Sequence, residues 1–275
     1  MQQHEGNSGF EIKQKLLPGK HVLSMARDIP ILLAVRDSTF INRHQIESLV
    51  SQSGKPEHWN NRNSRIRRLI SPLGQLVVYP QCFPYPGRVF SISREGLRTL
   101  ELAGIGLLSV TSGTEFLENI NQIPHFLGLN AIQIELKKAF NISKWYGDRY
   151  LKSMNLAVGK PTAKDYDSVA FIANPTDPES PKRIGIEYER VLKSKDRYAE
   201  IRKNLSTEEQ IDGLIYFADN DLVANQLAAV VHSQTLPVGI VTTHELYKLG
   251  SNCSILTVRD RQVVRWKLDK FIDAM

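Results

Sequence analysis

The sequence predicts a mixed α+β protein in two parts, with three helices and a β-hairpin first and a mixed α/β sheet after them. Two observations predict this class. Apolar residues at helical spacing precede a hairpin whose tip, 83–87, is rich in proline, and strand-like runs alternate with helical runs after residue 125. The length of 275 residues is enough for two modest domains.

The helices of the first part are bounded by capping and helix-breaking residues. Asp28 is a plausible cap for the first helix, and the third begins at Asn60 or Asn61 and stops at Pro72. The first two helices are expected over 28–35 and 42–50.

A strand, a turn and a returning strand follow the third helix. The strands are expected at 75–79 and 88–92, and a further helix opens at 93–97. Three helices followed by a hairpin is the order of a winged helix-turn-helix, whose third helix enters the major groove of DNA. The expected domain boundaries are an N-terminal arm over 1–27, the winged helix over 28–108, a linker over 109–124 and a second domain over 125–275.

The net charge of +6 is confined to one segment. Between Arg36 and Arg98 ten lysines and arginines stand against four acids, and 10 − 4 = +6 accounts for the whole excess. The rest of the chain balances at 25 against 25. A basic module on a neutral remainder points to a polyanionic partner.

A helical wheel of the third helix separates an apolar side from a polar side, and Arg62 falls on the apolar side, so it must occupy the first turn or extend outward. Arg65 and Arg68 are the main candidates for contact with double-stranded DNA. Alternatively, the arginines form a solvated face, or the domain binds protein instead. The expected DNA-binding residues are Asn61, Arg62, Ser64, Arg65, Arg68 and Arg88.

The second part alternates strands with helices, as a mixed α/β sheet does. Its expected helices are 125–140, 142–155, 193–205 and 220–231. Its expected strands are 167–172, 183–190, 212–217, 237–241 and 254–258.

The first two of these strands carry acids at a suggestive spacing. Asp167 opens one, and Glu187 and Glu189 point to the same side of the other because strand side chains alternate. A hairpin could bring the three carboxylates together, and Mg²⁺ prefers such oxygen ligands. Alternatively, they form a solvated strand pair in which Glu189 pairs with Arg190 or Arg197.

A hydrolase also needs a positive charge near the attacking water or the phosphate. Glu189 stands where a lysine two residues after Glu187 would be expected. Lys193 or Lys195 could supply the charge from the next element, and Lys160 is a weaker candidate.

Several short motifs together carry a resemblance. They are His125 with the helical residues 129–132, Trp145, Asp167, the Glu187-Tyr188-Glu189 run and the segment 194–198. With these, residues 28 to 235 resemble the replication-relaxation family, in which a winged helix precedes a restriction-endonuclease-like domain and which occurs around plasmids and mobile elements. The resemblance implies that Asp167, Glu187 and Glu189 hold the positions of that fold's acidic metal cluster. It also implies a role in replication, mobilisation or transcription control.

The expected function is therefore double-stranded DNA binding, with a degenerate nuclease-like domain that serves assembly. The alternative is a Mg²⁺-dependent endonuclease that uses Asp167, Glu187, Glu189 and Lys195; a protein-interaction scaffold is a third possibility. Without nuclease activity no cofactor is expected. Further expected partners are a second copy of the chain and relaxosome or replication proteins. No membrane-length apolar run or signal segment is visible, which predicts a cytoplasmic protein without membrane contact.

Overall fold

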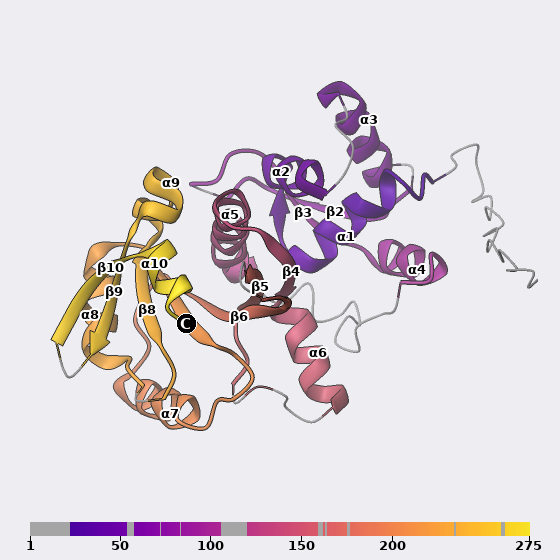
Figure 1. Ribbon diagram of the computed structural model, residues 1–275. Helices are drawn as coiled ribbons and strands as arrows, with labels where there is room; N and C mark the ends of the chain where they lie inside the picture. The colour runs from indigo at the N-terminus through magenta and orange to yellow at the C-terminus, as the bar shows by residue number, and fades with distance from the viewer. Residues whose placement is uncertain are drawn as a thin grey trace, which may run out of the picture.

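The protein is a mixed α/β structure with a helical N-terminal region and a large, mostly antiparallel sheet (Figure 1). The computed structural model describes residues 23–53, 58–71, 73–82, 84–105, 120–158, 162, 164–174, 177–233, 235–259 and 262–275.

The N-terminal region has the expected three helices and hairpin. Its helices are α1 (Asp28–Ser38), α2 (Arg43–Ser53), α3 (Trp59–Ile70) and α4 (Arg94–Leu102). Strands β2 (Leu76–Tyr79) and β3 (Val89–Ile92) form the hairpin, and the short strand β1 (Ile41–Asn42), which the sequence did not predict, pairs with β3 to give the order β1-β3-β2.

Capping explains where two of these helices begin. The Asn42 side chain accepts a hydrogen bond from the Gln45 amide at 2.9 Å, and the Gln45 side chain accepts one from the Asn42 amide at 3.2 Å. This reciprocal pair satisfies two donors at the start of α2. Helix α3 begins earlier than expected because His58 caps it, accepting a hydrogen bond from the Asn60 amide.

The second region is a seven-stranded sheet in the order β10-β9-β8-β7-β6-β5-β4. Strands β4, β5 and β6 form an antiparallel meander, β6, β7 and β8 are parallel, and β9 and β10 return antiparallel. The strands are β4 (Ile142–Gly147), β5 (Ser168–Asn174), β6 (Asp177–Glu189), β7 (Gly213–Ala218), β8 (Val238–Thr242), β9 (Ser254–Arg259) and β10 (Gln262–Lys267). The helices are α5 (Ile123–Ala139), α6 (Asp148–Val158), α7 (Lys195–Leu205), α8 (Asp221–Val230), α9 (Thr243–Leu249) and α10 (Leu268–Asp273).

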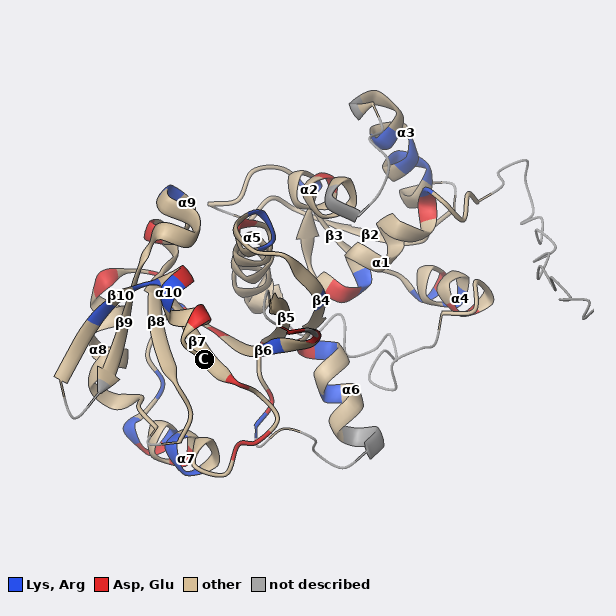
Figure 2. Ribbon diagram, viewed as in Figure 1, with Lys and Arg blue, Asp and Glu red and all other residues tan. Residues whose placement is uncertain are grey.

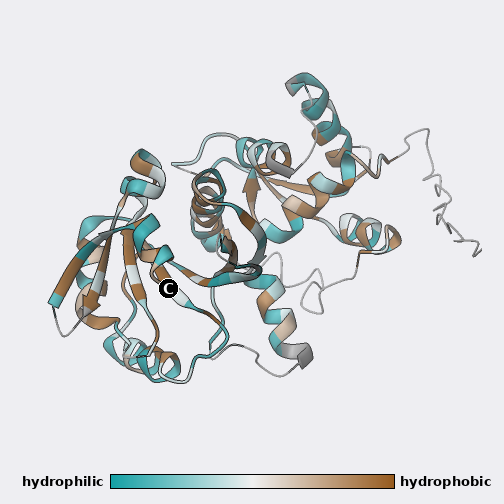
Figure 3. Ribbon diagram, in the orientation of Figure 1, coloured by the Kyte–Doolittle hydropathy of each residue, from teal (hydrophilic) through white to brown (hydrophobic). Residues whose placement is uncertain are grey.

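Helices cover both faces of this sheet. Side chains of α6, α7 and α8 pack on one face around Tyr216, and side chains of α5, α9 and α10 pack on the other around Phe217. Figure 3 shows the apolar residues along the strands, which lie between these two layers of helices. Adjacent residues of β7 thus belong to different apolar clusters, as strand alternation requires.

Two expectations for this region are wrong. Residues 142–147 are a strand rather than part of a helix, since β4 pairs with β5 from Ile142 to Gly147. The connection between the expected strands 167–172 and 183–190 is shorter than those bounds imply, because β6 already begins at Asp177, which pairs with Asn174. Prolines are tolerated there because this early part of β6 has only β5 beside it, and pairing with β7 starts at Ile184.

Helix α5 joins the two regions. The expected linker falls largely on residues 106–119, which lie outside the described residues; a 3-10 turn, η1 (Ile120–Gln122), precedes α5, which begins two residues before the expected position 125. Ile134 of α5 packs in the core of the N-terminal region, and Leu129 packs on the large sheet. Among the described residues, no helix combines the length and apolar character that crossing a membrane requires.

Candidate functional site

Arg62 is buried inside the N-terminal region. Its side chain is 2% exposed and donates hydrogen bonds to the Ser51 hydroxyl at 2.8 Å and to the Glu47 carbonyl at 3.2 Å. It therefore joins α3 to α2. Arg62 thus occupies the first turn of α3, which was one of the two expected positions, and does not extend outward. Its burial contradicts the expectation that it contacts DNA, because a side chain on the apolar side of α3 finds its partners on the neighbouring helix.

Arg65 and Arg68 bind the same buried carboxylate. Asp28 is fully buried, and its two oxygens contact Arg65 Nη1 at 3.2 Å and Arg68 Nη2 at 2.8 Å. Asp28 also accepts a hydrogen bond from the Ser24 amide at 2.7 Å. These contacts fasten α3 to the start of α1, so both arginines have a structural role whatever else they contact.

The outward face of α3 is centred elsewhere. At about 100° per residue, the buried residues Ile66 and Leu69 lie opposite Ser64 and Arg67, and both of the latter are exposed. Asn61 is exposed as well, on the flank of that face. Figure 2 shows in blue the arginines along α3.

Sequence reasoning left out Arg67 as a binding residue. The burial of its neighbours, which a helical wheel alone does not fix, shows that Arg67 is exposed on the outward face of α3. Arg88 is exposed immediately before β3, as the expectation requires.

The loop between β2 and β3 packs against the large-sheet region. Tyr85 lies in a cluster with Phe126 and Leu127 of α5. Burial raises the pKa of Tyr85, and a hydrogen bond with the Tyr188 side chain opposes that rise. Tyr85 thus holds this part of the loop beside the end of β6.

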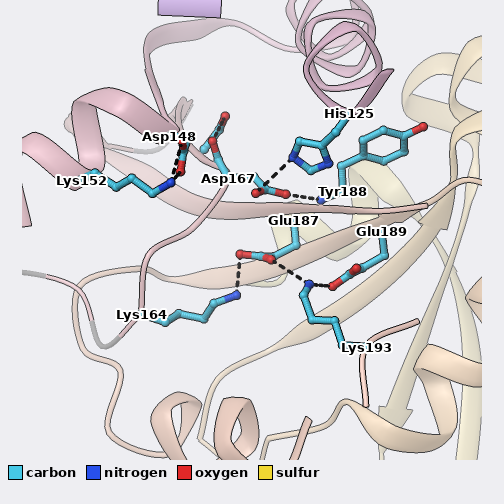
Figure 4. A network of polar contacts seen from close by, with 10 residues as sticks. His125, Asp148, Lys152, Lys164, Asp167, Glu187, Tyr188, Glu189 and Lys193 are labelled. Atoms are coloured by element: carbon cyan, nitrogen blue, oxygen red, sulfur yellow. Dashed lines mark hydrogen bonds and ion pairs between the residues drawn. The ribbon is translucent and has the colours of Figure 1, made fainter. Parts of the chain in front are cut away.

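Asp167 lies immediately before β5 and is held from two sides (Figure 4). One oxygen accepts a hydrogen bond from the Tyr188 amide at 2.8 Å, and the other is 3.4 Å from His125 Nε2. Burial by itself would raise the pKa of this carboxyl. The hydrogen bond and charge interaction with His125 and the bond from the Tyr188 amide outweigh that effect and hold the pKa below its usual value.

Glu187 is surrounded by two lysines. Its side chain is 6% exposed, with Lys164 Nζ 2.5 Å from one oxygen and Lys193 Nζ 4.0 Å from the other. Lys193 also forms an ion pair with Glu189. Burial raises the pKa of Glu187, and Lys164 opposes the rise; burial likewise lowers the pKa of Lys193.

The three acids do not converge as expected. In Figure 4 Asp167 lies with His125 and Tyr188 on one side of β6, while Glu187 and Glu189 lie on the other side with the lysines. No group of three or more potential metal ligands forms among the described residues.

The expected partners of the acids also differ from those found. Glu189 pairs with Lys193, whereas Arg197 pairs with Glu200 at 2.5 Å. Lys195 is exposed in the first turn of α7. Lys160 lies outside the described residues. Lys193 and Lys164 therefore supply the positive charge that a lysine at position 189 would have supplied. The sequence analysis did not name Lys164, because this residue comes from the segment before β5.

Tyr188 links the neighbouring polar groups. Its hydroxyl donates to Asp219 at 2.7 Å, and its ring stacks on His125 with centroids 5.5 Å apart. His125 thus has a structural place between Tyr188 and Asp167. The arrangement can hold charge in a fixed geometry at the end of the sheet.

No protein-family model, curated protein or solved structure matches this chain.

Proposed function

We propose that residues 28–105 form a winged helix-turn-helix that binds double-stranded DNA. The observation that carries this proposal is the order α1-β1-α2-α3-β2-β3 with a polar, basic outward face on the third helix. Arg67 and Ser64 are exposed on that face, and the excess positive charge of the chain lies within the same region. A helix of this kind enters the major groove, and basic residues around it neutralise phosphates.

The large sheet fits a nuclease-like domain in this proposal. The order of α5, the meander β4-β5-β6, the crossover through α7 and the parallel strand β7 supports a restriction-endonuclease-like core. Glu187 is already paired with Lys164 and Lys193, and Asp167 is bound to His125 and to the Tyr188 amide, which supports a degenerate site that serves assembly. Together with the resemblance to the replication-relaxation family, this favours a role in replication, mobilisation or transcription control of a plasmid or other mobile element.

Binding to duplex DNA tests the proposal directly. Fluorescence anisotropy with a labelled duplex should show an affinity that falls steeply with salt, because each neutralised phosphate contributes about −0.9 to the slope of log K against log salt. Asn61→Glu places an acid on the exposed face of α3 and should weaken binding. Asn225→Glu makes the same change at an exposed position of α8 and should leave binding unchanged. Affinity that ignores salt, or equal loss in both variants, would reject DNA binding by this helix and favour the protein-interaction scaffold.

A second candidate function is a Mg²⁺-dependent endonuclease. The observation that favours it is the pair of lysines at Glu187, since a hydrolase needs carboxylates for the ion and a cation near the scissile phosphate. In this reading Asp167, Glu187 and Glu189 would hold the metal, with Lys164 or Lys193 beside it.

Supercoiled plasmid incubated with Mg²⁺ or Mn²⁺ distinguishes the two functions. Nicking that disappears in Asp167→Asn and Glu187→Gln, but persists in the control Lys203→Ala at an exposed position of α7, would establish the nuclease. Intact plasmid at enzyme excess, with DNA binding retained, would establish the degenerate site.

A further inference from the structure

A basic groove lies on the flank of α3, beside its outward face. It has a volume of about 440 Å³ and is bordered by α2, α3 and the start of β3. Ile66, Ile70 and Phe90 contribute apolar side chains to it. Its polar lining residues are Arg43, His44, Asn63, Arg67 and Arg88.

The charge of the groove is of one sign. No acidic residue lines it within the described part of the chain. Arg67 and Arg88 are exposed, and neither forms an ion pair with a described residue. This contrasts with Arg65 and Arg68, whose guanidinium groups are bound to Asp28.

The start of α2 adds to this positive potential. Arg43 and His44 are the first two residues of α2, so the amino end of that 11-residue helix borders the groove. The partial positive charge at a helix amino terminus favours an anion.

We propose that this groove binds the sugar-phosphate backbone of one strand of duplex DNA, with Arg67 and Arg88 as phosphate contacts. The proposal rests on the DNA-binding function proposed above and assigns the position of the backbone within it. A guanidinium group can donate two parallel hydrogen bonds to phosphate oxygens, which suits a rim that carries arginines from α2, from α3 and from the segment before β3. The groove lies beside the Ser64 face of α3, so a strand held here would leave that face directed at the base edges.

Substitution of a groove residue should affect DNA binding differently from substitution of a residue that contacts bases. A lost phosphate contact weakens binding about equally for all duplex sequences and lowers the salt slope by about 1, whereas a lost base contact weakens binding for particular sequences. Arg67→Ala and Arg88→Ala should therefore each lower the slope by about 0.9, and the double variant by about twice that. Both side chains are exposed, so the fold should be retained, which circular dichroism checks.

The matched control is Arg98→Ala, which removes an exposed arginine from α4 outside the groove. We expect its salt slope to equal that of the unaltered protein. A full slope in the Arg67→Ala, Arg88→Ala double variant, or an equal decrease in Arg98→Ala, would overturn the groove assignment while leaving DNA binding in place. Loss restricted to one duplex sequence would also overturn it. If the unaltered protein binds DNA without salt dependence, the proposed function itself fails.

Discussion

At the scale of single residues, Asp28 is the residue on which the placement of α3 depends. It is fully buried and binds Arg65 and Arg68 together. We expect Asp28→Asn to lower the free energy of unfolding by about 2 kcal/mol, less than for a fully buried pair because both arginines are partly exposed and can regain water. Urea denaturation measures the change.

The control for this prediction is Asp37→Asn. Asp37 pairs with the adjacent Arg36 at 2.7 Å, but its side chain is 44% exposed. Exposed pairs contribute about 0 to 1 kcal/mol, so this variant should resemble the unaltered protein. Equal effects of the two substitutions would contradict the structural role of Asp28.

Asp167 makes the free energy of unfolding depend on pH in the acidic range. Its native pKa lies below the usual value, so the native state holds it ionised more readily than the unfolded chain does. Its contribution is therefore complete above the ordinary aspartate pKa of about 4 and is lost as pH falls through the lower native pKa.

Asp167→Asn removes this contribution. The variant should be less stable by about 1 to 2 kcal/mol near neutral pH, because hydrogen bonds to a charged group are lost. The difference should shrink as pH falls below about 4. A difference that stays constant down to acid-induced unfolding would show that the charge of Asp167 does not stabilise the fold. Urea denaturation at a series of pH values measures this.

At the scale of elements, α5 approaches β6 closely at Gly128. A methyl group added there would lie 2.2 Å from the Tyr188 ring, which is itself held by His125 and Asp219. Gly128→Ala should therefore destabilise the protein by about 1 to 3 kcal/mol through overpacking, although alanine is the better helix former. Thermal unfolding measures it.

A double-mutant cycle with Tyr188→Ala isolates this contact. Once the ring is removed, the added methyl group should cost little or should even stabilise the helix. If Gly128→Ala destabilises the Tyr188→Ala variant as much as it destabilises the unaltered protein, the destabilisation does not come from contact with the Tyr188 ring.

Elements with clear boundary residues could be predicted from the sequence. Helix α8 is an example, because Asn220 caps it by accepting a hydrogen bond from the Val223 amide. The early part of β6 could not be predicted in this way. Its composition is that of a turn, and only pairing with β5 makes it a strand.

The sequence predicted which residues of β6 belong to the candidate site, but not which side chains pair with them. Alternation along the strand places Glu187 and Glu189 on one side, as expected. Which lysines reach them depends on loops that the strand pattern does not describe. Lys164 was therefore missed, and Lys193 and Lys195 were left as alternatives, of which Lys193 pairs with Glu189. Asp167 precedes β5, so alternation along that strand did not fix the direction of its side chain.

At the scale of the whole molecule, the two regions share buried polar contacts through α5. The Gln45 side chain donates to the Leu127 carbonyl at 2.7 Å, and the Asn130 side chain donates to the Phe40 carbonyl at 2.7 Å. Both side chains are buried. Separating the regions would break these hydrogen bonds and would also expose to water the apolar side chains that pack between them, such as Phe126 and Ile134 of α5, which is costly.

We therefore expect the unaltered protein to unfold in one cooperative calorimetric transition, with equal calorimetric and van 't Hoff enthalpies. Asn130→Ala leaves the buried Phe40 carbonyl without its donor and should cost about 1 to 3 kcal/mol, moving the whole transition to lower temperature. Asn225→Ala, at an exposed position of α8, should leave the transition in place. Two separate transitions in the unaltered protein, or a shift of only one component in Asn130→Ala, would show that the N-terminal region and the large sheet unfold independently. A single transition would mean that α3 and the end of β6 belong to one cooperative unit, joined by the packing of α5 on both regions.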